Sequence, residues 1–152
     1  MTTALADVET EDTAIVTLKF KNGALGIIEA TTATRPTNLE GSISILGEHG
    51  TVVVGGVAVN EMQTWVFEDE QEGDSSVLEE FSVNPPNVYG FGHQAYYEHV
   101  VDCIVNGSAN LVDGLQGRKS IELISAIYES AETGKEVFLK FQPKHCRLGQ
   151  KS

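Results

Sequence analysis

Cysteine and long apolar runs are scarce in this chain, and each absence excludes a class of protein. The two cysteines, Cys103 and Cys146, are too few for a disulfide framework. No apolar run approaches the roughly 20 residues that a membrane-spanning helix needs. Residues 1–11 have neither the basic region nor the apolar region of a secretory signal peptide. We therefore expect a reduced, cytoplasmic protein.

Basic residues are also few. Lys and Arg together number 10 against 22 Asp and Glu, which gives a net charge of −12. Binding to nucleic acid or to an anionic membrane needs clustered cationic side chains. The composition therefore excludes nucleic acid and membranes as partners, while an acidic surface by itself mainly favours solubility.

The first part of the chain contains a series of expected strands. Residues 12–20 alternate in polarity, residues 24–34 follow as a second strand, and Asn22-Gly23 between them is a strong hairpin signal. A two-residue turn here sets Glu29 on the apolar side of the hairpin. Either a bulge shifts the register or Glu29 lies at the polar margin of the sheet, and we favour the bulge.

More strands are expected before the two prolines that end this part of the chain. They lie in residues 41–46, 51–59, 61–68 and 77–82. The last is expected to be an edge strand, because Glu79 and Glu80 discourage pairing with another chain.

Two helices and a closing strand are expected in the second part. Apolar residues recur at helical spacing from Tyr96 onward, and Gly107 ends this first helix. Asp113 caps the second helix, which ends at Gly134. The closing strand is expected in residues 136–141.

These elements predict an α+β fold, a largely antiparallel open β-sheet with the two C-terminal helices packed on one face. Residues 12–141 form the domain, between a flexible lead in residues 1–11 and a tail in residues 142–152. Strands such as residues 43–46 and 51–54 carry apolar side chains on both faces. Because one helical layer covers only one face, we expect a homo-oligomer, a dimer in the simplest case, that covers the other.

Two patterns superficially indicate other chemistry. Residues 114–120 contain glycines before Arg118 and Lys119, but their spacing is not that of a phosphate loop and no strand is expected before them. His99 and Cys103 lie four residues apart on the first helix, whereas a zinc site needs three or four protein ligands. We interpret these patterns as a helix start and a core cysteine, and we expect no metal site.

A polar cluster in two loops is the stronger candidate for a binding site. Arg35 follows a strand in a Pro-containing loop, where a guanidinium can hold a carboxylate or a phosphate with two hydrogen bonds. Tyr89 and His93 flank a Gly-Phe-Gly turn at a helix start, which favours anions and sugar hydroxyls. The alternative is a solvated loop with a histidine that only caps the helix. The substrate-binding candidates are Arg35, Asn38, Tyr89 and His93, with Glu40 in the same cluster.

Three motifs carry a resemblance to a known family. They are K-F-K-N-G-A-L-G-I-I-E-A from Lys19, G-S-I-S-I-L-G-E-H-G-T-V from Gly41, and a two-helix end that begins G-F-G-H-Q-A-Y-Y-E-H at Gly90. With them, nearly the whole chain resembles the C-terminal domain of the glucose-fructose oxidoreductase, inositol dehydrogenase and MocA family. The third motif, together with R-P-x-N-L-E-G-S from Arg35, is most similar to dehydrogenases of UDP-N-acetylglucosaminuronic acid and related nucleotide sugars.

The resemblance implies a C-terminal substrate-side and oligomerisation domain of an NAD- or NADP-dependent sugar or nucleotide-sugar dehydrogenase. In that family a glycine-rich turn binds the cofactor, and the catalytic lysine lies in a Glu-Lys-Pro motif; neither has a match in the printed sequence. We therefore assign no catalytic and no cofactor-binding residue, and we expect the chain alone to be inactive. A standalone carbohydrate-binding module and a structural assembly module remain the alternatives, because a fold does not fix a function.

Overall fold

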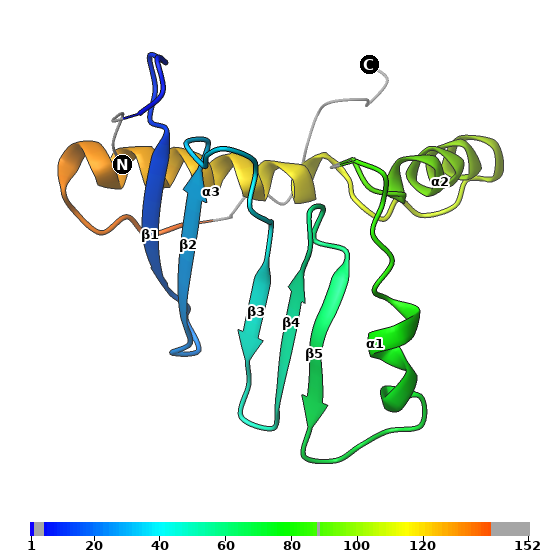
Figure 1. Ribbon diagram of the computed structural model, residues 1–152. Helices are drawn as coiled ribbons and strands as arrows, with labels where there is room; N and C mark the ends of the chain where they lie inside the picture. Colours follow the sequence, from blue (N-terminus) through cyan, green and yellow to red (C-terminus); the bar gives the residue numbers. More distant parts are fainter. Residues whose placement is uncertain (2–4, 88, 141–152) are drawn as a thin grey trace. The chain divides into compact units, whose positions relative to one another are not determined.

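A computed structural model describes residues 1, 5–87 and 89–140 of the chain (Figure 1). The chain divides into two compact units, Met1–Ala33 with Ala109–Ser152, and Thr34–Ser108. The first unit holds a β-hairpin and a long helix. The second holds a three-stranded sheet, a short helix and a longer helix.

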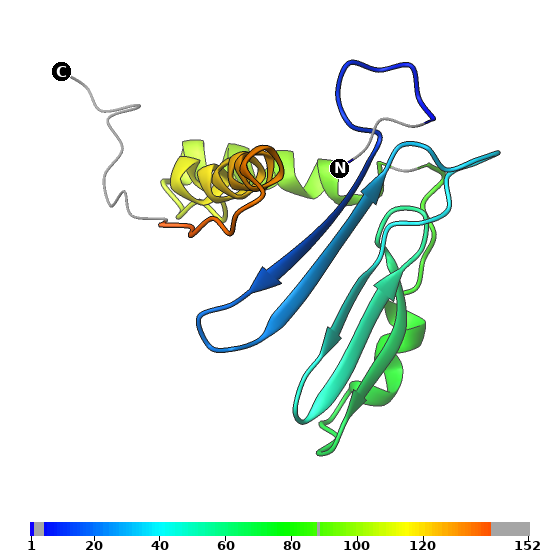
Figure 2. The ribbon, with the colours of Figure 1, turned by 90° about the vertical axis from the view of Figure 1, so that its left-hand side faces the viewer.

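The hairpin of the first unit pairs β1 (Thr13–Lys19) with β2 (Leu25–Thr31) (Figure 2). At its turn, the Phe20 N–H donates to the Ala24 carbonyl at 2.8 Å, and the Gly23 N–H donates to the Phe20 carbonyl at 2.9 Å. Gly23 has φ 94°, a left-handed conformation that glycine adopts without a steric penalty. This is a three-residue hairpin loop with glycine at its left-handed position, rather than a two-residue turn.

The longer loop shifts the register of the hairpin and gives its faces different characters. Glu29 pairs with Ile15, and Val16 pairs with Ile28. The expected register shift is therefore confirmed, because Glu29 leaves the face that Val16, Leu18 and Ile28 share. Those three side chains are half-buried. The opposite face leaves large apolar side chains exposed, namely Ile15 (66%), Leu25 (79%) and Ile27 (75%).

Asp12, directly before β1, is the most buried polar residue in the described part of the chain, with 2% of its surface exposed. Its Oδ2 accepts the N–H of Leu5 at 2.7 Å and the N–H of Ala6 at 2.9 Å. Backbone donors offset part of the cost of burying a carboxylate. These bonds attach the preceding loop to the start of the hairpin.

The antiparallel sheet of the second unit has the order β3 (Ile43–Leu46), β4 (Gly50–Gly55) and β5 (Glu61–Phe67). The pairing of β4 with β5 shifts near the end of β4, which leaves Gln63 as an extra residue in β5. A bulge of this kind turns a side chain away from the regular alternation. It lies at the end of the sheet where the candidate site is found.

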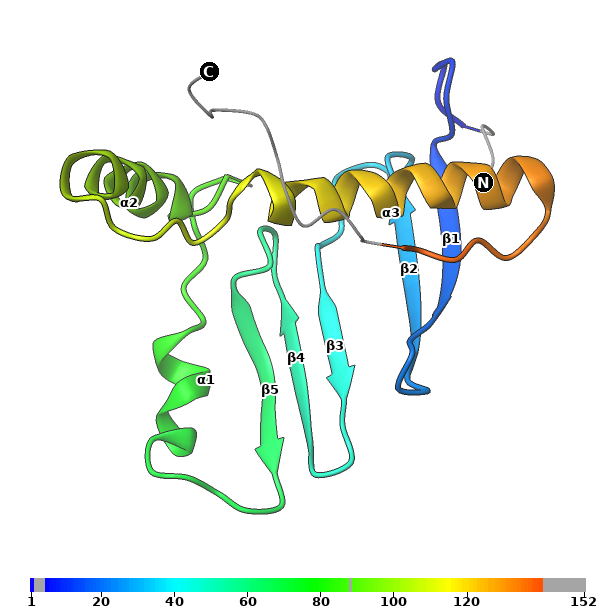
Figure 3. The same cartoon turned by 180° about the vertical axis from the view of Figure 1, so that it is seen from behind.

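A short helix, α1 (Val77–Glu80), lies beside β5 (Figure 3). The predicted edge strand over residues 77–82 is therefore wrong. Ser82 makes an isolated antiparallel bridge to Glu61, and residues 77–80 are helical. Leucine and glutamate favour helix over strand, so local propensity decides this segment.

The turn that leads into α1 is fixed by one carboxylate. In η1 (Asp74–Ser76), Asp74 Oδ2 accepts the Gln71 N–H at 2.7 Å, and its Oδ1 accepts the indole N–H of Trp65 at 2.8 Å. Trp65 lies on β5, so the bond ties the turn to the sheet. This side-chain hydrogen bond joins the turn to β5, whereas an edge strand would pair with β5 through backbone hydrogen bonds.

Both predicted helices are confirmed. The first is α2 (Gly92–Asn106), which ends at Gly107 in a left-handed conformation, φ 70°. The second is α3 (Gly114–Thr133), and Asp113 caps it by accepting the Gln116 N–H at 2.8 Å. These caps satisfy backbone groups that a helix leaves without internal partners.

The predicted closing strand over residues 136–141 is not found in its described part. Residues 136–140 have no regular structure, and Phe141 lies outside the described residues. The Lys140 N–H donates to the Glu122 carboxylate of α3 at 3.2 Å. A side chain on the helix, rather than a neighbouring strand, satisfies this backbone donor.

The α+β class is confirmed: antiparallel strands and helices make up the molecule. The strands belong to two sheets, of two and three strands, where the pattern indicated one. Apart from Pro85, no large apolar side chain in the described part of the chain is buried. Among the same residues, no helix has both the length and the apolar character of a membrane span.

Candidate functional site

A groove lies at the end of the three-stranded sheet where β3 begins, β4 ends and β5 begins. Its volume is about 540 Å³, within the range of small-molecule sites. Three segments of the second unit line it: the loop before β3, the β4–β5 connection with the start of β5, and the segment after α1. The lining residues are Leu39, Glu40, Gly56, Val57, Glu61, Gln63, Asn84, Pro85 and Pro86.

Glycine and the bulge together place the amide of Gln63 in this groove. A Cβ atom on Gly55 would lie 2.3 Å from Nε2 of Gln63, so the amide occupies space that any other residue at position 55 would fill. Gly56 has φ 89° and lines the groove with its backbone. In the described structure the Gln63 amide forms no internal hydrogen bond, and its donors and acceptor are available to a ligand.

A chain of hydrogen bonds holds the carboxylate of Glu61. Asn60 Nδ2 donates to the Val83 carbonyl at 2.6 Å and to Asn84 Oδ1 at 3.2 Å. Asn84 Nδ2 in turn donates to Glu61 Oε1 at 3.0 Å. Because Asn84 occupies one oxygen of this carboxylate, the other oxygen is oriented and can accept from a ligand.

The groove is negative. Among the described residues that line it, Glu40 and Glu61 are the only ionisable ones, and Lys, Arg and His are absent. Apolar walls come from Leu39, Val57 and the buried Pro85. A ligand with hydroxyl or amide donors and an apolar face suits this surface, whereas an anion does not.

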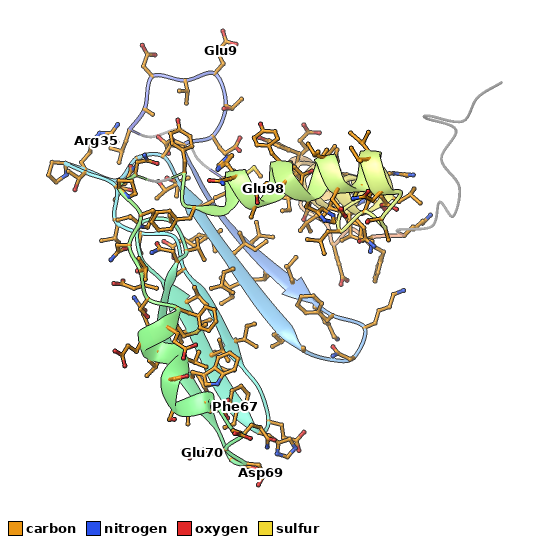
Figure 4. All side chains as sticks on the ribbon, turned by 90° about the vertical axis from the view of Figure 1, so that its right-hand side faces the viewer. Glu9, Arg35, Phe67, Asp69, Glu70 and Glu98 are labelled. Atoms are coloured by element: carbon orange, nitrogen blue, oxygen red, sulfur yellow. The ribbon has the colours of Figure 1, made fainter. Side chains whose placement is uncertain are left out.

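Arg35 and Asn38, predicted from the sequence, lie on the exposed loop that leads into β3. Arg35 Nη1 donates to the Thr34 carbonyl at 2.8 Å. Figure 4 shows Arg35 at the outer end of this loop, at the opposite end of the sheet from Phe67 and Asp69. Asn38 directly precedes Leu39 and Glu40, which line the groove. Arg35 and Asn38 are therefore close to the groove in sequence.

Tyr89 and His93 are brought together at the start of α2. Their rings are 6.2 Å apart between centroids in an edge-to-face arrangement. The Tyr89 N–H donates to Oδ1 of Asn87 at 3.0 Å, and Gly90 has φ 68°. Both side chains are exposed. The two candidate side chains therefore lie next to each other at this turn, just after Pro85 and Pro86 of the groove wall, and their role in binding stays a prediction.

Sequence reasoning missed the residues that line the groove on β5 and after α1. Glu61, Gln63 and Asn84 carry most of its hydrogen-bonding groups, yet none belongs to a recognisable motif. Two local signals were visible, the Gly55-Gly56 pair and the double proline at 85 and 86. A glycine pair in a strand indicates a bulge or a close approach of the backbone to another group. The pair therefore indicated where the groove lies, but not which residues of other segments line it.

Metal ions and dinucleotides each require an arrangement that the described residues do not provide. His99 Nε2 and Cys103 Sγ are 3.5 Å apart on α2, but no group of three such ligands occurs in the described part of the chain. G-F-G-H-Q-A from Gly90 has the glycine spacing of a relaxed dinucleotide fingerprint. That fingerprint needs a strand directly before the helix, and residues 83–87 are irregular.

The fold and the groove define a class, an α+β domain that offers a ligand surface next to loop residues suited to anions. Residues 3–139 match the Oxidoreductase family, C-terminal alpha/beta domain. The chain belongs to this family.

Two solved structures are similar to this chain. The WlbA dehydrogenase from Bordetella pertussis, in complex with NADH and UDP-GlcNAcA, is 44% identical with a TM-score of 0.80, over 88% of this chain and 38% of that one. The WlbA dehydrogenase from Chromobacterium violaceum, in the same kind of complex, is 42% identical with a TM-score of 0.76, over 88% of this chain and 36% of that one. The chain thus spans less than two-fifths of the length of either enzyme.

Proposed function

We propose that this chain is the substrate-side domain of an NAD-dependent dehydrogenase that acts on a nucleotide sugar of the UDP-GlcNAcA class. The identity of 44% to an enzyme crystallised with NADH and UDP-GlcNAcA carries this proposal. The groove supports it independently, because carboxylate and amide groups beside apolar walls suit a hydroxylated ligand.

In this proposal the chain binds and orients the substrate, and the cofactor is held by a part that resembles the rest of the WlbA enzymes. NAD or NADP bound there supplies the acceptor for a hydride from the sugar. Arg35 holds an acidic group of the nucleotide sugar with its guanidinium. Asn38, Tyr89 and His93 hydrogen-bond its hydroxyls from the neighbouring loop and helix start. No chemical step is assigned to residues of this chain.

Isothermal calorimetry on the chain tests the proposal. UDP-GlcNAcA is expected to bind, because the groove and the Arg35 loop lie within this chain. NADH and NADPH are expected not to bind, because the sequence has no strand that leads into a glycine-rich turn. Absence of UDP-GlcNAcA binding would contradict the assignment as a substrate-side domain, and micromolar NADH binding would contradict the division of roles.

A second role is supported by a separate observation. Large apolar side chains are exposed on both sheets, including Ile27 at 75% and Leu46 at 81%. We propose that the chain forms a homo-oligomer, with a dimer as its smallest form, through an open sheet face. A cytoplasmic location is proposed as well, on the scarcity of cysteine.

A further inference from the structure

We infer that the groove at the end of β3, β4 and β5 binds the neutral nucleoside end of the nucleotide sugar, with uridine as its ligand chemistry. The choice of a nucleotide sugar rests on the proposed function. The choice of its nucleoside end, rather than its diphosphate or acidic sugar, rests on the groove itself.

Charge excludes the anionic parts of such a ligand from this groove. Glu40 and Glu61 are its ionisable lining residues, and none of the described residues that line it is cationic. Like charges a few ångströms apart repel strongly at a partly desolvated surface. A diphosphate or a sugar carboxylate therefore belongs outside the groove, where Arg35 lies on the adjoining loop.

Hydrogen-bonding groups in the groove match those of a uridine. The ribose presents two vicinal hydroxyls, and the Glu61 oxygen that Asn84 leaves available can accept from a hydroxyl. Uracil presents one N–H donor and carbonyl acceptors along one edge. A primary amide such as that of Gln63 offers both an acceptor and donors for that edge.

Shape supports the same occupant. Pro85, Leu39 and Val57 give apolar surface against which a planar base can lie. The volume of about 540 Å³ is large enough for a nucleoside. The Gln63 side chain fills the space above Gly55, so the missing Cβ of Gly55 lets the amide lie against the backbone of β4.

The inference is tested by NMR titration of the ¹⁵N-labelled chain with uridine, N-acetylglucosamine and UDP-GlcNAcA. Uridine is expected to shift the amide signals of Gly56, Gln63 and Asn84. UDP-GlcNAcA is expected to shift the same signals and those of the Arg35 loop. N-acetylglucosamine is expected to leave the groove signals unchanged.

Three variants and one control sharpen the test. Glu61→Gln is expected to weaken uridine binding about tenfold, because a charged acceptor becomes neutral. Gln63→Ala and Gly55→Ala are expected to weaken it about threefold or more, by removing the amide and by displacing it. Gln63→Ala decides the matter if Gly55→Ala does not fold. Glu70→Gln changes the same charge at the far end of the sheet and is expected to bind as the native chain does (Figure 4).

The outcomes separate this inference from the proposed function. UDP-GlcNAcA binding with no shift in the groove overturns the inference and leaves the proposed function standing. Groove shifts with N-acetylglucosamine but not with uridine also overturn it, because the groove then holds the sugar. Uridine binding in the groove without UDP-GlcNAcA binding supports the assignment of the groove to a nucleoside, but overturns its link to a nucleotide sugar and with it the proposed function.

Discussion

Single residues at the groove end of the second unit have distinct electrostatic roles. Glu61 is held by Asn84 inside the groove, whereas Arg35 extends from the loop before β3. In the proposed function, the negative groove and the positive loop residue bind different parts of the ligand according to charge. The proposed role of each charged residue therefore depends on its position in the fold as well as on its charge.

Arg35 provides the first prediction. Arg35→Ala is expected to weaken UDP-GlcNAcA binding by about 1.5–3 kcal/mol, because a charge-assisted pair with an acidic group is lost. Arg35→Lys is expected to recover only part of the loss, since an ammonium cannot make the paired hydrogen bonds of a guanidinium. Calorimetry gives both values, and Arg118→Ala in α3 is the matched control. An unchanged dissociation constant for Arg35→Ala would assign this residue to a solvated loop.

Asp74 provides a prediction about how stability depends on pH. The pKa of Asp74 is lowered from 3.8, first by the Gln71 N–H and then by the Trp65 indole N–H. The pKa of Asp74 in the folded chain lies below its ordinary value of 3.8. The ionised carboxylate therefore stabilises the folded chain fully at any pH above 3.8. This stabilisation is lost as the pH falls through the folded pKa.

The single tryptophan reports this titration directly. Trp65 emission, followed from about pH 6 to about pH 2, is expected to change with a midpoint below 3.8. Asp74→Asn is expected to abolish the transition, and Asp69→Asn, on the neighbouring loop, is expected to retain it. A native midpoint above 3.8 contradicts the hydrogen-bonding account of this turn.

Elements of this fold are bounded by local chemistry. Asp113 begins α3, and the left-handed glycines at positions 107 and 134 end α2 and α3. The Gln116 side chain bonds within α3 instead of to the cap, because its Oε1 accepts from Lys119 Nζ at 2.7 Å. The cap of α3 therefore depends on the Asp113 side chain.

Removing that cap is the prediction at this scale. Asp113→Ala is expected to lower the free energy of unfolding by about 1 kcal/mol, because the Gln116 N–H loses its acceptor. Asp113→Asn is expected to retain most of the stability, since asparagine also caps helices. Urea unfolding followed by circular dichroism measures both, with Ser120→Ala inside α3 as a near-neutral control. Equal stability of the alanine and asparagine variants would show that the cap is not needed.

At the scale of the whole molecule, exposed apolar surface is the dominant feature. Apart from Pro85, no large apolar side chain in the described residues is buried, although 41% of the sequence is hydrophobic. Exposed apolar surface of this extent supports the proposed association. On the sheet of the second unit, Leu46 and Val66 lie on the face away from the Trp65 indole and its turn.

Association is therefore the last prediction. Light scattering at micromolar concentration is expected to give twice the chain mass of 16.4 kDa. Leu46→Glu is expected to weaken the dimer by at least about tenfold, because it buries a charge in an apolar interface. Ile45→Glu, on the opposite face, is expected to leave the dimer intact. A monomeric native chain contradicts the proposal, and dissociation by Ile45→Glu alone would show that the other face associates.

The sequence by itself determined the local features of this protein. Turn and cap residues act over a few positions, so Gly23, Asp113 and Gly134 placed the hairpin turn and the bounds of α3. The discordant Glu29 indicated the shifted register, because a carboxylate on an apolar face is unfavourable. Arg35, Tyr89 and His93 stay predictions from the sequence, made because loops commonly carry binding residues.

Only the tertiary structure decided which distant residues share a surface. Glu61, Gln63 and Asn84 meet because a bulge in β5, the missing Cβ of Gly55 and the Asn60 hydrogen bonds bring three segments together. Likewise, the turn before α1 is tied to β5 by the bond between Asp74 and Trp65, two residues nine positions apart that no local pattern pairs. Contacts between distant segments depend on register and packing, and these are set by the whole unit rather than by any short stretch of sequence.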